Sequence, residues 1–195
     1  QPAILTASVA LWRLWCQSSS VRPAFVAGHS LGEYSALVAA EVLSFADAVR
    51  LVERRGQLMQ QAVPEGKGAM AAILGLGDEQ IIELCAAASQ GQVVSAVNFN
   101  APGQVVIAGE TDAVARAIDA CKDAGAKRAI ALPVSVPSHC ALMQPAAEQL
   151  SVDFAALQWQ KPGITLVQNV TARPAADVAD LRQLLVEQLY SPVRW

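Results

Sequence analysis

Charge of either sign is scarce in this sequence. Charged residues make up 16% of the 195, with 14 basic and 17 acidic side chains and a formal net charge of −3. A protein that binds nucleic acid usually carries a basic stripe, so this balance argues against a nucleic-acid partner. No apolar run approaches the length of a membrane span, and no charged-then-apolar signal opens the chain, so we expect no membrane association.

Closely spaced cysteines are also missing, and histidines are few. Cys16, Cys85, Cys121 and Cys140 contain no C-x-x-C pair, and the chain has two histidines. This pattern is typical of reduced thiols, so we expect a cytoplasmic protein without a metal site. Hydrophobic residues make up 53% of the chain, which predicts a sizeable buried core rather than disorder.

One pentapeptide, Gly28-His29-Ser30-Leu31-Gly32, lies between a short apolar run and a stretch typical of a helix. At a sharp strand-to-helix turn a serine is strained and its hydroxyl is exposed above the strand end. We expect glycine at both ends of this motif because a side chain there would collide with the backbone. The new helix directs its amides toward the serine, so we predict Ser30 as a nucleophile and the Leu31 N–H as an oxyanion donor. The alternative is a Gly-Ser loop without chemical meaning.

Hydrophobic periodicity and turn residues divide the rest of the chain into elements. Ser44 is the expected N-cap of one helix, and Gly125 is expected to end another. The predicted helices span residues 3–17, 33–40, 45–63, 78–89, 111–124 and 176–190. The predicted strands span residues 23–27, 69–74, 93–98, 104–108, 128–132 and 164–170.

The order of these elements predicts one domain inserted in another. Residues 65–132 follow the order βαββαβ, the split pattern of a small ferredoxin-like domain. The flanking parts, 1–64 and 133–195, would then form a larger α/β domain that the insert interrupts. We therefore expect an α/β fold with a parallel sheet in the larger domain.

A serine hydroxyl needs a base within hydrogen-bond reach, and the choice is narrow. His29 is adjacent to Ser30, and because neighbouring side chains diverge at such a turn, it is better placed to brace the loop. His139 is therefore the predicted base, in a segment where Pro137 favours an extended approach. No aspartate is obviously placed as a third member, and a backbone carbonyl can orient the imidazole instead.

Arg55 is the most informative charged residue. On the helix at 45–63 it shares a face with apolar residues such as Val52 and Met59, whereas Arg54 shares its face with Asp47 and other polar residues. Arg55 is thus predicted to point inward and Arg54 to point to water. A buried guanidinium needs a partner, which is either a protein carboxylate or the carboxylate of a ligand. In the second case Arg55 would select a dicarboxylic acyl group such as malonyl.

Several stretches of the chain resemble the malonyl-CoA:acyl carrier protein transacylases of bacterial fatty-acid synthesis. The resemblance runs along the whole length, in order. It is carried by residues 28–37, 45–52 with 55–56, 68–72, 97–104, 133–142 and 188–193.

By this resemblance Ser30 is the acylated nucleophile, His139 the base and Arg55 the residue that binds the malonyl carboxylate. The residue that matches Gln188 offers its backbone carbonyl to the histidine. Asn98 and Asn100 match asparagines near the family's cleft and are candidates for its lining. The family also implies a hydrolase-like large domain, a ferredoxin-like insert and no cofactor beyond the CoA thioester substrate. We expect a monomer.

The implied partners are malonyl-CoA and an acidic acyl carrier protein. Lys122, Lys127 and Arg128 are candidates for a basic patch that meets the carrier, although a solvated surface is an equally good interpretation. Three other functions stay open. One is a serine esterase or thioesterase of the α/β-hydrolase type, and another is an acyltransferase domain excised from a polyketide synthase. The third is a scaffold without enzymatic activity.

The chain also departs from the family pattern at both ends. Family members begin with a strand and a Gly-Gln-Gly-Ser-Gln loop, whose glutamine supplies a second oxyanion donor. Neither is present here, and the chain stops at Trp195, before the usual C-terminal segment. Losing one oxyanion donor typically lowers turnover by about 10²–10³. We therefore expect these 195 residues alone to be a poor enzyme.

Overall fold

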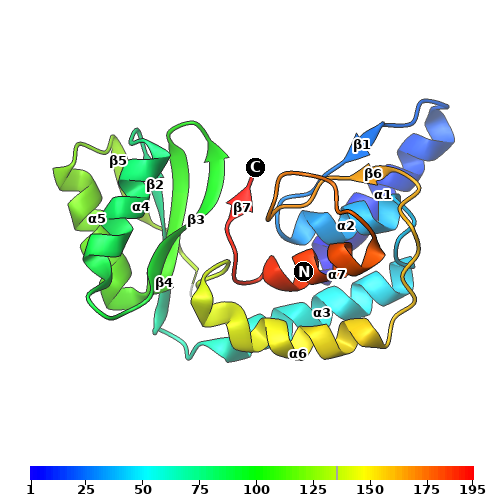
Figure 1. Cartoon of the computed structure of the whole chain (residues 1–195). Helices are drawn as coiled ribbons and strands as arrows, with labels where there is room; N and C mark the ends of the chain where they lie inside the picture. Colours follow the sequence, from blue (N-terminus) through cyan, green and yellow to red (C-terminus); the bar gives the residue numbers. More distant parts are fainter. Residues whose placement is uncertain (135) are drawn as a thin grey trace.

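A computed structural model describes residues 1–134 and 136–195 in two lobes (Figure 1). Ser135, within the stretch 133–142 that resembles the family, lies outside the described residues. The first lobe contains α1 (Pro2–Ser18), β1 (Phe25–Val26), α2 (Leu31–Ala39), α3 (Phe45–Ala62), a 3₁₀ turn (Ala141–Met143), α6 (Gln144–Ala155), β6 (Thr165–Leu166) and α7 (Val178–Glu187). The second contains β2 (Gly68–Leu74), α4 (Asp78–Ser89), β3 (Val94–Ala101), β4 (Gln104–Glu110), α5 (Thr111–Asp123) and β5 (Arg128–Ala131).

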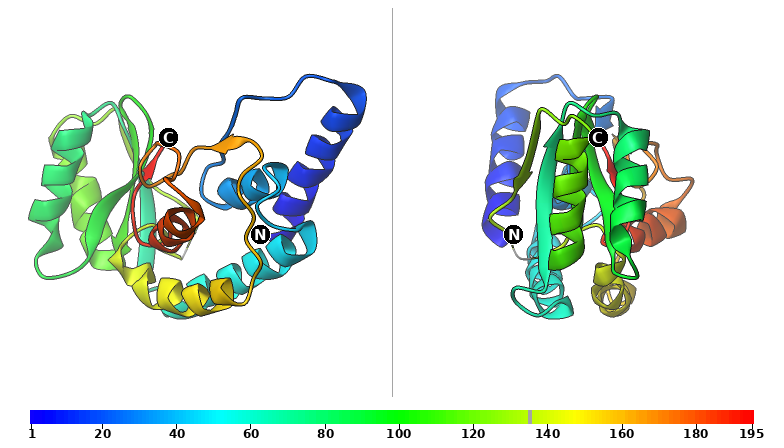
Figure 2. Two further views of the ribbon diagram at one scale, coloured as in Figure 1. Left: turned by 45° about the vertical axis from the view of Figure 1, so that its right-hand side comes forward. Right: turned by 90° about the vertical axis from the view of Figure 1, so that its left-hand side faces the viewer.

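The second lobe is a sheet covered by two helices. Its strands lie in the order β5-β2-β4-β3 and are all antiparallel to their neighbours. The helices α4 and α5 pack on one face (Figure 2), where Ile81 and Val114 meet strand residues such as Ile73 and Ile107. The last strand, β7 (Val193–Arg194), joins this sheet parallel to β3 although it follows the helices of the first lobe. The C-terminal segment therefore ties the two lobes together.

The first lobe is mainly helical around a small parallel pair of strands. β1 and β6 pair in parallel, with Val26 opposite Leu166. Helices α1, α2, α3, α6 and α7 surround one hydrophobic core, in which Leu5, Leu37 and Phe154 are almost fully buried. The α3 helix lies along α6 across the base of this lobe (Figures 1 and 2). This packing presents one face of α3 to the turn at Ser30.

Most predicted elements are present, with three differences. Ser44 caps α3 by accepting a hydrogen bond from the Asp47 amide, and Gly125 follows α5 with a positive φ, as predicted. The strand predicted at 164–170 is wrong beyond Leu166, because the chain there leaves the sheet and Val167 bridges to Pro174. Helix α6 was not predicted, and β7 lies outside every predicted element.

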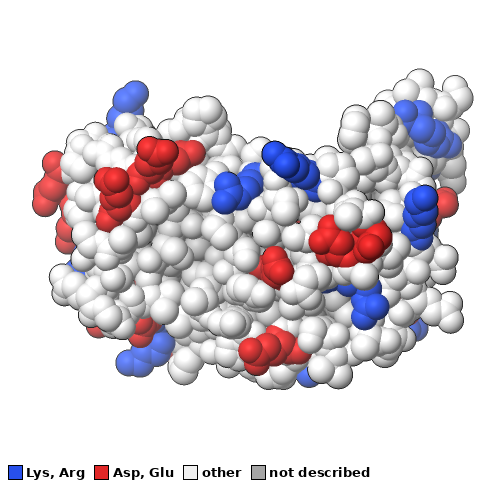
Figure 3. Space-filling model, viewed as in Figure 1, with Lys and Arg blue, Asp and Glu red and all other residues white. Residues whose placement is uncertain are grey.

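Across the described residues, 1–134 and 136–195, no helix is both long and apolar enough to cross a membrane. On the face seen in Figure 3 both signs of charge are spread out, with a group of acidic side chains over the upper part of the lobe that contains α4. The predicted patch residues Lys122, Lys127 and Arg128 are exposed, and Lys122 pairs with Asp119 at 3.1 Å.

The turn between β1 and α2 has the strain expected for its serine. Ser30 is the N-cap of α2 with φ 53° and ψ −108°, a backbone conformation that residues with a side chain rarely adopt. A Cβ added at Gly28 would lie 2.0 Å from the backbone of Gly32, so glycine is required there. The matching expectation for Gly32 is wrong. A Cβ at Gly32 meets nothing within 4 Å, because that residue is already in the first turn of α2.

These two glycines provide a paired test in which each variant is the other's control. Gly28→Ala should destabilise this chain by about 2 kcal/mol or more, because backbone atoms must move apart. Gly32→Ala should be neutral or stabilising by up to about 1 kcal/mol, because alanine favours a helix over glycine. Urea unfolding followed by circular dichroism measures both. Equal destabilisation by the two variants would contradict this description of the turn.

Candidate active site

The backbone of Ser30 is held by an asparagine from a distant part of the chain. The Ser30 N–H donates to Asn169 Oδ1 over 2.6 Å, and Asn169 Nδ2 donates to the Gly28 carbonyl over 2.8 Å. Asn169 is buried and follows β6, the strand that pairs with β1. These two hydrogen bonds span the turn from both sides and offset the cost of its strained conformation. No pattern in the sequence predicts this role for Asn169.

The hydroxyl of Ser30 meets the predicted base. Ser30 Oγ lies 2.8 Å from His139 Nε2, and His139 Nδ1 lies 2.6 Å from the backbone carbonyl oxygen of Gln188. A carbonyl oxygen only accepts, so Nδ1 carries the proton, and Nε2 is left with a lone pair that faces the hydroxyl. This tautomer is the one that can remove a proton from Ser30. The Gln188 carbonyl occupies the place of the missing aspartate.

The imidazole of His139 is held in its neutral form. Burial and, after it, the positive charge of Arg55 lower the pKa of His139 from 6.5 to about 3, against the opposing effect of the Gln188 carbonyl. His139 is 3% exposed and has a positive φ of 65°. Its N–H donates to the Leu189 carbonyl over 2.9 Å, which fixes the strained backbone next to Gln188. The imidazole of His139 can therefore accept a proton even in weakly acidic solution.

Arg55 lies beside the same hydroxyl and is almost fully buried. Its Nη2 donates to Ser30 Oγ over 3.0 Å and to Gln188 Oε1 over 3.1 Å, and its Nη1 donates to Gln1 Oε1 over 2.8 Å. The guanidinium carbon lies 5.5 Å from the centre of the Tyr34 ring. Among the described residues, 1–134 and 136–195, no carboxylate forms an ion pair with Arg55. Arg54, one residue earlier, is exposed and contacts Asp153 at 3.3 Å.

Side chains that the sequence did not single out complete the centre. Gln188 is fully buried, and its Nε2 donates to the Ser30 carbonyl over 3.0 Å and to Glu33 Oε2 over 2.6 Å. Glu33 is 1% exposed, and burial raises its pKa to about 7. The only sequence feature that could indicate a role for Glu33 is its position in the first turn of α2, three residues after Ser30. This feature is not specific, because an acidic residue is common in the first turn of any helix. No pattern in the sequence indicates that Gln1 contacts Arg55.

The remaining predicted residues differ in how they meet this centre. The Leu31 amide stands at the N-terminus of α2 directly after Ser30. Asn100 Oδ1 lies 2.8 Å from His29 Nε2, so His29 braces the turn against β3 as predicted. Asn98 is buried in β3, and its Nδ2 has no hydrogen-bond partner among the described residues. No hydrogen bond between the described residues joins Asn98 to Ser30.

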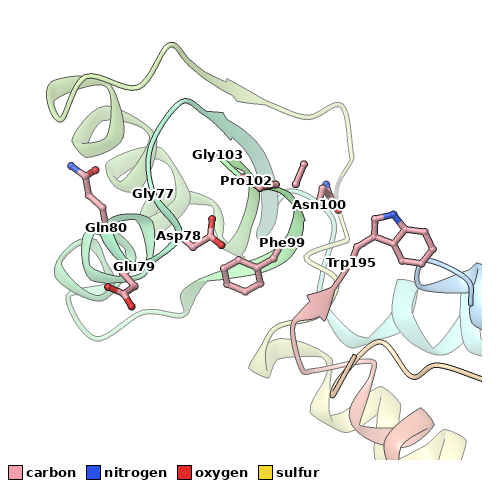
Figure 4. A pocket seen from close by; sticks show the side chains of 10 residues that line it. Gly77, Asp78, Glu79, Gln80, Phe99, Asn100, Pro102, Gly103 and Trp195 are labelled. Atoms are coloured by element: carbon pink, nitrogen blue, oxygen red, sulfur yellow. The ribbon is translucent and has the colours of Figure 1, made fainter. Parts of the chain in front are cut away.

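A hollow of about 980 Å³ lies on the second lobe where Trp195 approaches it (Figure 4). Asn100 and Trp195 line it together with Phe99, Asp78 and residues at the N-terminus of α4. The ring of Trp195 packs against His29 with the ring centres 5.6 Å apart. The hollow therefore begins one side chain away from the turn that carries Ser30. No group of three potential metal ligands is found in residues 1–134 and 136–195.

The sequence and the fold of this chain both have known relatives. The family model of the acyl transferase domain matches residues 1–195. The chain is 62% identical, over all of its length, to the malonyl CoA-acyl carrier protein transacylase of Salmonella typhimurium and covers 63% of that protein. It is 47% identical to the Bacillus subtilis protein of the same name, of which it covers 62%.

Solved structures agree with this relationship. An acyl carrier protein S-malonyltransferase from Vibrio cholerae superposes with a TM-score of 0.97 at 61% identity, covering all of this chain and 63% of that one. A malonyl-transacylase in complex with a type II PKS acyl-carrier protein superposes with a TM-score of 0.98 at 58% identity, with the same coverage. The chain thus spans about 63% of these relatives, and it belongs to the acyl transferase domain family.

Proposed function

We propose that the protein containing this chain moves a malonyl group from CoA to the phosphopantetheine thiol of an acyl carrier protein in fatty-acid synthesis. The names of the relatives support the substrates and the carrier. The arrangement of Ser30, His139 and Arg55 supports a covalent malonyl-serine intermediate. No bound cofactor is needed, because the thioester of malonyl-CoA is itself the activated acyl donor.

The reaction would proceed in two transfers. Ser30 Oγ attacks the thioester carbonyl while its proton passes to His139 Nε2, and the Leu31 N–H stabilises the oxyanion. The C–S bond then breaks, and the departing CoA sulfur takes the proton from His139. In the second transfer His139 removes a proton from the carrier's thiol, whose sulfur attacks the Ser30 ester. The proton returns to Ser30 Oγ as that ester bond breaks.

One observation carries the choice of a malonyl group. The guanidinium of Arg55 is buried beside the Ser30 oxygen without a carboxylate partner among the described residues. An uncompensated buried charge is unfavourable, so the site favours an acyl group that brings its own carboxylate. The planar guanidinium can hold that carboxylate through two hydrogen bonds. A serine esterase or thioesterase has no use for such a group.

The finer organisation is part of the proposal. We place residues 1–64 and 133–195 in a hydrolase-like large domain and residues 65–132 in a ferredoxin-like insert. The order β2-α4-β3-β4-α5-β5 supports the insert, and β7 is the part of the large domain that crosses to its sheet. We also propose a cytoplasmic monomer with Asn98 and Asn100 near the cleft. In this proposal Lys122, Lys127 and Arg128 meet the acidic carrier.

The covalent intermediate is the most direct test of the proposed function. Incubation of the full-length protein with malonyl-CoA should add the mass of one malonyl group, and Ser30→Ala should abolish the adduct. Intact-protein mass spectrometry measures both. Absence of any adduct on the unsubstituted, folded protein would reject the proposed function and favour a binding role instead.

Arg55 and its exposed neighbour form a matched pair. Arg55→Ala should lower kcat/KM for malonyl-CoA by about 10²–10³, because truncating one partner of a buried charge pair costs about 2–5 kcal/mol. Acetyl-CoA, which lacks the carboxylate, should react at least as well as before. Arg54→Ala should leave kcat/KM unchanged for both thioesters. Steady-state kinetics with both thioesters measures the effect, and an equal loss for the two substrates in Arg55→Ala would favour an esterase-like site.

The lowered pKa of His139 predicts the pH dependence of Ser30. The neutral imidazole is the active base, and with a pKa of about 3 it stays neutral far below the ordinary value of 6.5. Phenylmethanesulfonyl fluoride is an uncharged probe of this reactivity. Its rate of reaction with Ser30 at about pH 5.5 should be within about twofold of that at about pH 8, whereas an ordinary histidine would give a fall of about tenfold. A fall with a midpoint near 6.5 would contradict the buried, neutral base.

A further inference from the structure

Gln188 has a partner for every one of its hydrogen-bonding groups. It follows α7, where its N–H donates to the Leu184 carbonyl over 2.9 Å and its own carbonyl accepts from His139. Its side-chain oxygen accepts from Arg55, and its side-chain nitrogen donates to the Ser30 carbonyl and to Glu33. The residue is fully buried, so water does not replace these partners. One residue therefore joins the base through its backbone carbonyl, and the nucleophile and the guanidinium through its side chain.

Arg55, Glu33 and the Ser30 carbonyl together decide which way this amide faces. Glu33 can only accept a hydrogen bond when ionised, and Arg55 can only donate. Gln188 therefore turns its nitrogen toward Glu33 Oε2, at 2.6 Å, and its oxygen toward Arg55 Nη2, at 3.1 Å. The reversed amide would set two donors against each other at Arg55 and two acceptors against each other at Glu33. Glu33 thus keeps an acceptor in front of Arg55 without touching Arg55 itself.

A carboxylate in this position is costly. Glu33 is buried in the first turn of α2, and its Oε1 has no hydrogen-bond partner among the described residues. Its bonds from Gln188 and the Asn169 amide, together with the charge of Arg55, offset only part of the effect of burial, which raises its pKa to about 7. A raised pKa means that the folded protein is destabilised as pH rises from about 4.5 to about 7 and Glu33 loses its proton. Packing alone would be served as well by a neutral side chain.

We infer that Glu33 is a positioning residue for acyl-group selection. It orients the Gln188 amide so that Arg55 is held with its fork beside the Ser30 oxygen, where a malonyl carboxylate can bind. This inference rests on the proposed function and adds a residue that touches neither substrate nor base. The site then contains groups that contact or react with the acyl group and, apart from these, a buried carboxylate that positions Arg55.

The discrimination between malonyl-CoA and acetyl-CoA tests this role, because a ratio of rates does not depend on the fraction of protein that is folded. The ratio is measured in the full-length protein from the rates of acyl-Ser30 formation. Glu33→Met removes the acceptor and should lower the ratio by about tenfold or more, and Gln188→Met, which keeps the backbone carbonyl for His139, should do the same. Glu33→Gln keeps an oxygen but loses the charge and should lower it by about threefold. Glu53→Met, an exposed carboxylate on α3, is the control and should leave the ratio unchanged.

The coupling of the two residues is decisive. In the Gln188→Met background, neither Glu33 substitution should lower the ratio further, because the amide that Glu33 orients is gone. Unchanged ratios in the Glu33 variants, or effects that add in full to that of Gln188→Met, would overturn the inference. If Glu33→Met does not fold, Glu33→Gln alone and combined with Gln188→Met decides in the same way. A protein that forms no malonyl-Ser30 at all rejects the proposed function instead, which keeps the two failures apart.

Discussion

The burial of one positive charge beside one hydroxyl organises this centre. Arg55 reaches Ser30 from the inner face of α3, and α3 is held there by α6 and by the core of the first lobe. The guanidinium is compensated by neutral oxygens from Gln1, Ser30 and Gln188 and by the face of Tyr34. Neutral acceptors offset only part of the free energy that is lost when a charge is buried. In the proposed reaction, the substrate carboxylate supplies the missing compensation, so binding and selection are the same event.

The same charge also sets the state of the base. Burial and the nearby guanidinium keep His139 neutral, and the Gln188 carbonyl fixes the proton on Nδ1. Gln188 serves both groups at once, with its backbone toward His139 and its side chain toward Arg55 and Glu33. A helix end, rather than an acidic third residue, therefore aligns the base. Because β7 follows α7 in the chain and pairs with β3, this helix end also lies close to one of the links between the two lobes.

Local patterns in the sequence predicted what local physics determines. The inward face of Arg55 follows from helical periodicity, the cap at Ser44 from its side-chain chemistry, and Gly28 from the crowded turn. The expectation for Gly32 was wrong because the chain is already helical there, and the strand after Leu166 was wrong because the apolar run leaves the sheet. Asn169, Gln1 and the side chain of Gln188 were missed because their contacts cross more than fifty positions of the chain, and no local pattern encodes such pairs. The pairing of His139 with the Gln188 carbonyl was available only through resemblance to a family.

In the proposed reaction, Arg55 receives the carboxylate of the acyl group while Ser30 carries its carbonyl. A crystal structure of the full-length protein trapped as malonyl-Ser30 would show whether this is so. We expect both carboxylate oxygens within hydrogen-bond distance of the Arg55 guanidinium, with the imidazole of His139 still bonded to the Gln188 carbonyl. A malonyl-serine whose carboxylate points to solvent, with Arg55 bound only to protein oxygens, would contradict it.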